Sequence, residues 1–291
     1  MMTFDTSSRD AVVTAALRRA SSLAMLPETA TRVIQLASDP NVTMGRLAEV
    51  IETSPELCAR ILRIVNSAFY GFPGEVRSIQ RATTLMGLES VRNVTVAASL
   101  TRVFQGRSLS ATFSPKDIWT HSVAVGTATR LLAEAAVPTL AEEAFLAGML
   151  HDIGLMMELQ MDRAKLSSVV AVVEAGQADV LGAEEAAFGA THQDFGAALL
   201  TAWGLPSSLS ITAQYHHSPL PLPAQHRLVP ALVYTAERLV AGVDRVFLLD
   251  DRSSIVSDDL LECFSMSRDR LVAVTAELPA ALDEGSRLFV Q

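Results

Sequence analysis

Helix start signals recur along this chain of 291 residues, and they constrain its fold more than any other feature. Ser54 and Ser114 each stand immediately before a proline, in the sequences TSPEL and FSPKD. A serine hydroxyl can accept a free backbone N–H of the first helical turn, and proline is compatible with that turn. The segment TLAE at 139–142 has the spacing of a capping box. These signals predict helices that begin near each of the three segments.

Apolar side chains then recur at the three- and four-residue spacing of a helix with one buried face. Pro27 opens one such segment, which ends at Asp39-Pro40. Further helices are predicted at 78–86, 89–104, 163–175, 192–202, 206–216, 226–241, 257–264 and 267–277. No segment shows the alternation of a half-buried strand. The predicted fold class is therefore all-α.

The sequence predicts two helical lobes. A polar stretch with little periodicity, QGRSLSATFSP at 105–115, is the best candidate for the boundary between them. It separates an N-terminal lobe at 22–110 from a second lobe at 111–291, and residues 1–21 form a lead-in. We expect Trp203 to pack between the lobes, because Gly204 and Pro206 mark a helix end and the next helix start beside it.

The charge balance limits the binding partners. The formal net charge is -9, so a broad phosphate-binding surface is not expected, and duplex nucleic acid is excluded as a partner. The two cysteines, Cys58 and Cys263, stand alone and predict free thiols. The start lacks a basic segment followed by an apolar one, and no run of about 18 apolar residues occurs. These observations predict a cytoplasmic protein that does not enter a membrane.

One polar pair interrupts an otherwise apolar segment, AGMLHDIGLMM at 147–157. Burying His151 and Asp152 without partners would cost several kcal/mol, so they should hold a metal ion, be hydrogen bonded, or line a cleft. Four of the other histidines accompany them in the second half, near helix ends or apolar faces: His121, His192, His216 and His217. For any one histidine a hydrogen-bonded structural role is the commoner one. As a set they make metal coordination the alternative, because imidazole and carboxylate suit iron, manganese and zinc.

Several segments resemble the HDOD domain, a regulatory relative of the HD metal-dependent phosphohydrolases. In the second half they are WTHSVAVGTATRLL, EEAFLAGMLHDIGLMMEL, THQDFGAALLTAWGLPSSLSITAQYHHSP and LVYTAERLV, in this order. In the first half, NSAFYG at 66–71 and SIQRATTLMGLESVRNV at 78–94 resemble the helical half that ordinary HD hydrolases lack. The resemblance spans about residues 22–285. It implies an all-α fold in which an N-terminal helical lobe packs against an HD-like lobe.

The resemblance also implies a set of metal ligands. In HD hydrolases a histidine, a histidine-aspartate pair and a later aspartate hold the metal, and the branch that cleaves cyclic dinucleotides adds further histidines. The matching positions in this chain are His121, His151, Asp152, His192, His216, His217 and Glu237. The implied cofactor is a divalent transition metal: iron, manganese or zinc.

The chain departs from the hydrolase pattern at three points. Glu237 stands where the later aspartate is expected, Leu155 stands where a lysine often follows the pair, and no Gly-Tyr-Pro motif follows His217. The longer side chain of glutamate moves the carboxylate, and loss of the lysine removes a cation that would neutralise phosphate charge. These departures favour binding without turnover.

The expected function is that of a non-catalytic signalling or regulatory protein that acts through protein contacts and retains part of the HD metal pocket. The alternative is a metal-dependent phosphohydrolase or cyclic-dinucleotide phosphodiesterase. Arg60 and Arg63 are candidate contacts for an acidic partner or a small phosphorylated effector, although such arginines are usually solvated or paired. Signalling proteins are the expected partners.

Overall fold

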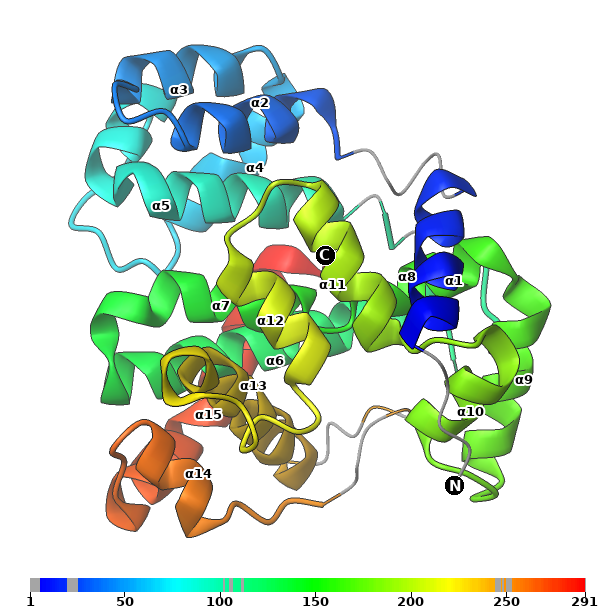
Figure 1. The fold of residues 1–291 in the computed structure, drawn as a ribbon. Coiled ribbons are helices and arrows are strands. Elements are labelled where there is room, and N and C mark those ends of the chain that lie inside the picture. Colours follow the sequence, from blue (N-terminus) through cyan, green and yellow to red (C-terminus); the bar gives the residue numbers. More distant parts are fainter. Residues whose placement is uncertain are drawn as a thin grey trace.

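The structure is a computed structural model that describes residues 6–19, 26–101, 103–104, 107–110, 113–243, 247, 249 and 253–290. Over these residues the fold is all-α and contains no strand, as predicted (Figure 1). The helices are α1 (Thr6–Arg19), α2 (Glu28–Ala37), α3 (Met44–Glu52), α4 (Pro55–Val65), α5 (Ile79–Leu100), α6 (Pro115–Ala136), η1 (Pro138–Leu140), α7 (Ala141–Leu150), α8 (Ile153–Met161), α9 (Arg163–Glu174), α10 (Val180–Phe188), α11 (His192–Ala202), α12 (Ser207–Tyr215), α13 (Ala224–Gly242), α14 (Asp258–Cys263) and α15 (Arg268–Phe289). None of these helices has both the length and the hydropathy needed to cross a bilayer.

The helix starts predicted at Ser54 and Ser114 are confirmed. Each serine hydroxyl accepts a backbone N–H of the first turn, from Leu57 and Asp117 respectively, at 3.4 Å. The capping box predicted at 139–142 is wrong. Pro138 begins a 3-10 turn that encloses the threonine of this segment, and α7 then starts without a side-chain cap. The Thr139 hydroxyl therefore lies within the 3-10 turn and not on the residue directly before α7, so it does not cap α7.

Helices α2 to α5 form the N-terminal lobe, at the top of Figure 1. In this lobe α2, α3 and α4 each pack against α5. Gly87 interrupts α5 with a φ of 78°, a conformation that glycine adopts at little cost and other residues rarely do. This break falls between the helices predicted at 78–86 and 89–104.

Helices α6 to α15 form the second lobe, with α6 and α7 packed together at its centre (Figure 1). Gly126 of α6 and Gly148 of α7 face each other, and a side chain at either position would collide with the opposite helix. The pair is surrounded by α12, α13 and α15, and α11 packs against α8 and α12. The helices that carry the site histidines are therefore in direct contact.

Helix α1 lies on the second lobe, away from α2 (Figure 1). It packs against α8 and α11, and Arg9 Nη2 lies 2.6 Å from Glu185 Oε2 on α10. The predicted lead-in at 1–21 is thus a docked helix where it is described. The boundary placed at residues 21–22, and part of the one placed at 105–115, lie outside the described residues.

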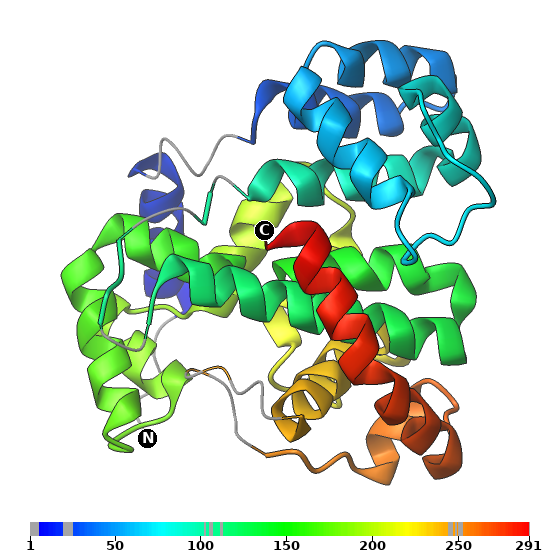
Figure 2. The same cartoon turned by 180° about the vertical axis from the view of Figure 1, so that it is seen from behind.

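The two lobes meet along a seam. At the seam α5 packs on α7, and α15 runs up to it from α14 (Figure 2). Arg63 of α4 donates a hydrogen bond to the Leu288 carbonyl at 3.1 Å, and the Trp119 indole donates to the Phe289 carbonyl at 2.8 Å. These contacts hold the end of α15, which continues through Pro279 well past the end predicted at residue 277.

Trp203 lies between the lobes, as expected. Its side chain is buried at the end of α11, beside a left-handed Gly204 with a φ of 70°. Together with Leu26 and Arg32 of the N-terminal lobe it lines a pocket of about 880 Å³.

Candidate metal centre

The seven candidate ligands predicted from the sequence converge in the second lobe. They are His121 on α6, His151 at the end of α7, Asp152 before α8, His192 at the start of α11, His216 and His217 after α12, and Glu237 on α13. Six of these side chains are buried, and His217 is half-buried. Residues separated by more than a hundred positions in sequence thus form one compact cluster.

The histidine-aspartate pair occupies the junction of two helices. His151 closes α7, and Asp152 precedes the first residue of α8. Two residues later, Gly154 allows α8 to cross directly over the start of α11, because a side chain at this position would overlap the His192 carbonyl. This crossing brings the Asp152 carboxylate beside His192.

Asp152 divides the cluster into two groups. Its Oδ1 lies 3.5 Å from His192 Nε2 and 3.4 Å from His216 Nε2. Its Oδ2 lies 3.2 Å from His151 Nε2 and 3.7 Å from His121 Nε2. Within each group the ligand atoms all lie within 4.8 Å of one another. Subsite A consists of Asp152, His192, His216 and His217, and subsite B consists of His121, His151 and Glu237. The aspartate belongs to subsite A and turns its second oxygen toward subsite B.

Outer hydrogen bonds orient the imidazole rings. His151 Nδ1 lies 2.7 Å from the Gly148 carbonyl, and His216 Nδ1 lies 3.0 Å from the Ala213 carbonyl. Because a carbonyl only accepts, each Nδ1 must donate, and Nε2 is left facing Asp152. The third ring, His192, donates Nδ1–H to the Glu184 carboxylate at 2.8 Å. Glu184, a glutamate in the apolar stretch before His192, was not among the residues predicted from the sequence.

The cluster perturbs the pKa values of its own histidines. Burial opposes the charged form of His151, but Asp152 and Glu237 outweigh burial and raise its pKa well above 6.5. Burial, followed by the charge on His151, lowers the pKa of His121 to about 3. Burial and the neighbouring His216 lower the pKa of His217 well below its usual range. In the absence of a metal, the carboxylates therefore favour a proton on His151.

The donor arrangement fits a cation. His192 Nε2 lies 3.4 Å from His216 Nε2 and 3.1 Å from His217 Nε2, so imidazole nitrogens face one another beside a carboxylate. In subsite B, His151 Nε2 and Glu237 Oε1 are buried 3.3 Å apart, and neither has a hydrogen bond of good geometry among the described residues. Lone pairs at such separations repel unless a proton or a metal ion lies between them. These nitrogen and oxygen donors suit a divalent transition metal.

Most of the cluster is buried among the described residues, and His217 is its most exposed member. Phe247 stacks on the His121 ring with centroids 4.5 Å apart, and Phe113 packs on Phe247. Leu155, at the position where the hydrolases often carry a lysine, is buried in the core. The pockets lined by Arg60, Arg130, Trp203 or Tyr215 include none of the seven cluster residues.

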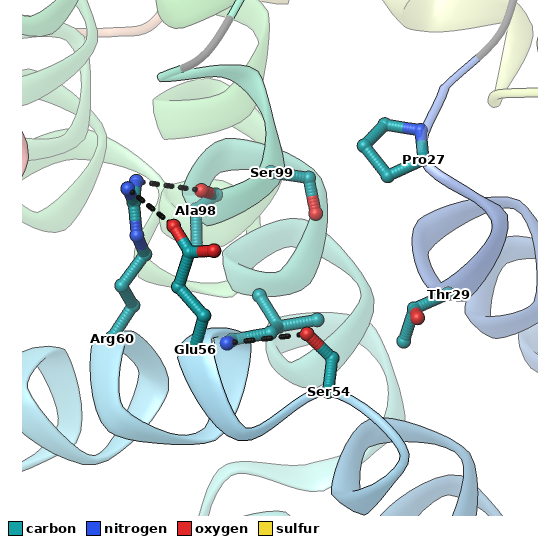
Figure 3. Close-up of a pocket in the computed structure, with 8 residues that line it drawn as sticks. Pro27, Thr29, Ser54, Glu56, Arg60, Ala98 and Ser99 are labelled. Atoms are coloured by element: carbon teal, nitrogen blue, oxygen red, sulfur yellow. Dashed lines mark hydrogen bonds and ion pairs between the residues drawn. The ribbon is translucent and has the colours of Figure 1, made fainter.

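The two arginines predicted to contact a partner lie in the N-terminal lobe, apart from this cluster. Arg60 lines a pocket of about 70 Å³, where its guanidinium donates to Glu56 at 3.0 Å and to the Ala98 carbonyl at 3.2 Å (Figure 3). Arg63 is bound to the Leu288 carbonyl across the seam. Both arginines therefore have internal contacts that a partner would share or replace.

A sequence model of the HDOD domain matches residues 23–219, about two thirds of the chain. This chain belongs to the HDOD family. An uncharacterised protein of Treponema pallidum is 22% identical to this HDOD protein over 237 residues, which are 78% of the chain and 44% of that protein. The chain thus spans less than half the length of this relative.

Solved structures support the same fold. An HDOD domain protein of unknown function from Geobacter sulfurreducens has a TM-score of 0.79 and 21% identity, over 99% of this chain and 100% of its own. A candidate signal transduction protein from Marinobacter aquaeolei has a TM-score of 0.77 and 22% identity, over 100% of this chain and 68% of its own. A candidate phosphohydrolase from Shewanella amazonensis has a TM-score of 0.72 and 22% identity, over 94% of this chain and 98% of its own. At these identities the likeness establishes the fold.

Proposed function

We propose that this HDOD protein is a non-catalytic signalling component whose cluster holds a divalent transition metal as a structural or sensing element. The observation that carries the proposal is the burial of the cluster: Phe247 stacks on His121, and six of the seven candidate ligands are buried. Metal sites that stabilise a fold are closed by protein ligands, whereas catalytic sites keep a position open for water or substrate.

The residues near the pair also favour binding over turnover. Leu155 points into the core, so it offers no charge to a phosphate group. Glu237 reaches subsite B from α13, with its Oε1 at 3.3 Å from His151 Nε2, and so a glutamate can take the place of the expected aspartate as a ligand. The cluster would retain the donors that a metal needs without a cation for phosphate.

A bound ion would link the helices of the second lobe. His121, His151, His192, His216 and Glu237 come from five different helices, so an ion held by them would oppose separation of those helices. A bound metal polarises its ligands and any water in its shell. In the proposed role the ion changes the stability of the lobe, and the lobe passes that change to the seam.

Signal output is proposed to run through the N-terminal lobe and the seam to a partner protein. The signalling name of the Marinobacter aquaeolei structure supports this context. Arg60 lines a surface pocket, and Arg63 joins α4 to the end of α15, so a partner bound near them would contact both lobes. A pull-down with full-length protein tests this role. Arg60→Glu with Arg63→Glu should weaken capture, whereas Arg77→Glu at an exposed ion pair should not.

A metal-dependent phosphohydrolase is the second candidate. The clustering of seven candidate donors and the half-buried His217 favour it, and the Shewanella amazonensis protein carries the name phosphohydrolase. Measuring metal content by elemental analysis, beside hydrolysis of a generic phosphodiester and of cyclic dinucleotides, separates the candidates. Bound metal without hydrolysis supports the non-catalytic role. Metal-dependent hydrolysis would contradict it.

A further inference from the structure

A pair of buried carboxyl side chains lies behind subsite A, on the far side of His192. Glu184 comes from α10 and Glu158 from α8, and both have 0% exposure. Both Glu184 oxygens lie 2.8 Å from His192 Nδ1, and Oε2 also accepts the His192 backbone N–H at 3.0 Å. One carboxylate thus fixes the ring and the backbone of this ligand.

Glu184 differs in charge from the partners of two other rings. His151 and His216 donate Nδ1–H to neutral backbone carbonyls, whereas His192 donates to a carboxylate. A charged acceptor holds the Nδ1 proton more strongly and makes Nε2 a better electron donor to a metal. This carboxylate lies at subsite A, where His192 Nε2 lies 3.5 Å from Asp152 Oδ1.

Glu158 supports the buried charge of Glu184. Burial raises the pKa of Glu158 well above 4.5, and the adjacent Glu184 raises it further. Both Glu158 oxygens are buried and make no hydrogen bond of good geometry among the described residues. A protonated Glu158 would have an O–H to offer to Glu184. A neutral donor offsets part of the cost of holding a carboxylate away from water. Glu158 lies on α8, the helix that Asp152 precedes, so one helix positions both side chains.

We propose that Glu158 and Glu184 form a positioning pair that holds His192 Nε2 toward Asp152 and makes subsite A the tighter of the two metal sites. This proposal rests on the proposed metal-holding function. Neither glutamate is a ligand, and both act through His192. The ion that the pair favours is a divalent metal with affinity for imidazole, such as zinc.

Zinc titration of the metal-free full-length protein by calorimetry tests the order of the two sites. Wild type should bind in two steps of unequal affinity. Glu184→Gln keeps the shape and removes the charge, so it should weaken the tighter step by about 10- to 100-fold and leave the weaker step unchanged. Glu185→Gln is the matched control, because this neighbour pairs with Arg9 and does not touch His192; it should bind as wild type does.

Two variants of Glu158 test its role as a neutral donor. Glu158→Gln presents an amide N–H to Glu184 and should bind zinc within about 3-fold of wild type, since the donor is retained. Glu158→Leu removes the donor and should weaken the tighter step. Equal affinities in wild type and Glu184→Gln would overturn the proposal, as would an equal loss in Glu185→Gln.

Nitrogen NMR of the His192 ring in metal-free protein at alkaline pH tests the positioning directly. We expect the proton on Nδ1 in wild type, Glu158→Gln and Glu184→Gln, and a mixture of the two tautomers in Glu184→Leu. A wild-type ring with its proton on Nε2 would overturn the positioning pair even if zinc binds tightly. The expected tautomer in a protein that binds no zinc would leave the positioning of His192 intact and contradict the metal-holding function.

Discussion

The guanidinium of Arg130 lies over the ring of Phe69, 3.9 Å from its centroid, so the loop at 66–71 rests on the helix that carries His121. Arg130 also contacts Glu142 of α7 at 3.4 Å, and Tyr70 of the same loop donates to Glu142 at 3.0 Å. A network of the buried Arg130 and the half-buried Phe69, Tyr70 and Glu142 thus joins the N-terminal lobe to the two central helices of the second lobe.

Arg130→Met should lower the free energy of unfolding by about 2 kcal/mol, because it leaves the half-buried Glu142 without its cation. Burial raises the pKa of Glu142, and Arg130 opposes that rise. Urea denaturation measures the change. Arg77→Met is the control, since Arg77 forms an exposed pair with Glu75 and should cost less than about 1 kcal/mol. Similar losses in the two variants would show that the network contributes little.

Removal of the histidine-aspartate pair should abolish metal retention. With zinc at a hundredfold excess over its dissociation constant, binding should stabilise wild type by about 2.7 kcal/mol, and EDTA should remove that gain. The double variant His151→Ala, Asp152→Ala should melt at the same temperature with and without EDTA. Metal content and melting temperature are the two measurements.

Two other outcomes of this experiment are informative. If the pair is only hydrogen bonded into the core, the double variant should lose about 2–4 kcal/mol whether or not metal is added, and wild type should ignore EDTA. Phosphodiester hydrolysis by wild type that the double variant lacks would instead identify an enzyme.

Acid should destabilise the metal-free protein partly through His121. Burial and the charge on His151 lower its pKa from 6.5 to about 3, so the unfolded chain binds this proton more readily than the folded chain does. The stability from His121 is therefore complete above pH 6.5 and is lost as pH falls toward 3. In His121→Gln this loss is absent, so the stability advantage of wild type should shrink by up to about 1.4 kcal/mol per pH unit. Urea midpoints in EDTA at several pH values test this, and parallel curves would contradict it.

Duplex DNA should not bind with useful affinity at physiological salt. The net charge of -9 opposes approach to a phosphate backbone, because nonspecific DNA binding depends on clustered lysine and arginine. A gel shift with unrelated duplexes tests this expectation. Micromolar or tighter binding that weakens with added salt would overturn it.

Sequence signals correctly predicted helix boundaries that depend on interactions between residues close in the sequence. The serines before Pro55 and Pro115 fixed two helix starts, and the break at Gly87 separated two predicted helices. The predicted end of α15 was wrong because tertiary contacts extend this helix. Side chains from two other helices donate hydrogen bonds to the carbonyls of Leu288 and Phe289. A proline within a helix costs one hydrogen bond, which such packing outweighs.

The residues of the candidate site could be predicted from the sequence, but their positions relative to one another could not. The resemblance named the seven side chains that the structure brings together, yet nothing in their spacing indicates that Asp152 faces two groups with different oxygens. Glu184 lies in an apolar segment outside the HDOD-like segments, and Glu158 lies in one of those segments with no ligand role implied for it. Only their burial near His192 draws attention to them. Phe247, which stacks on His121, lies far from it in the sequence, so no local pattern predicts this contact.

Gly154, two residues after Asp152, has a steric role that does not depend on the metal ligands. A methyl group at Gly154 would overlap the His192 carbonyl, so this position records how closely α8 crosses α11. The constraint is steric, and it would persist in a descendant whose histidines had all been replaced. In such a protein the glycine would mark the ancestral helix crossing after every metal ligand had disappeared.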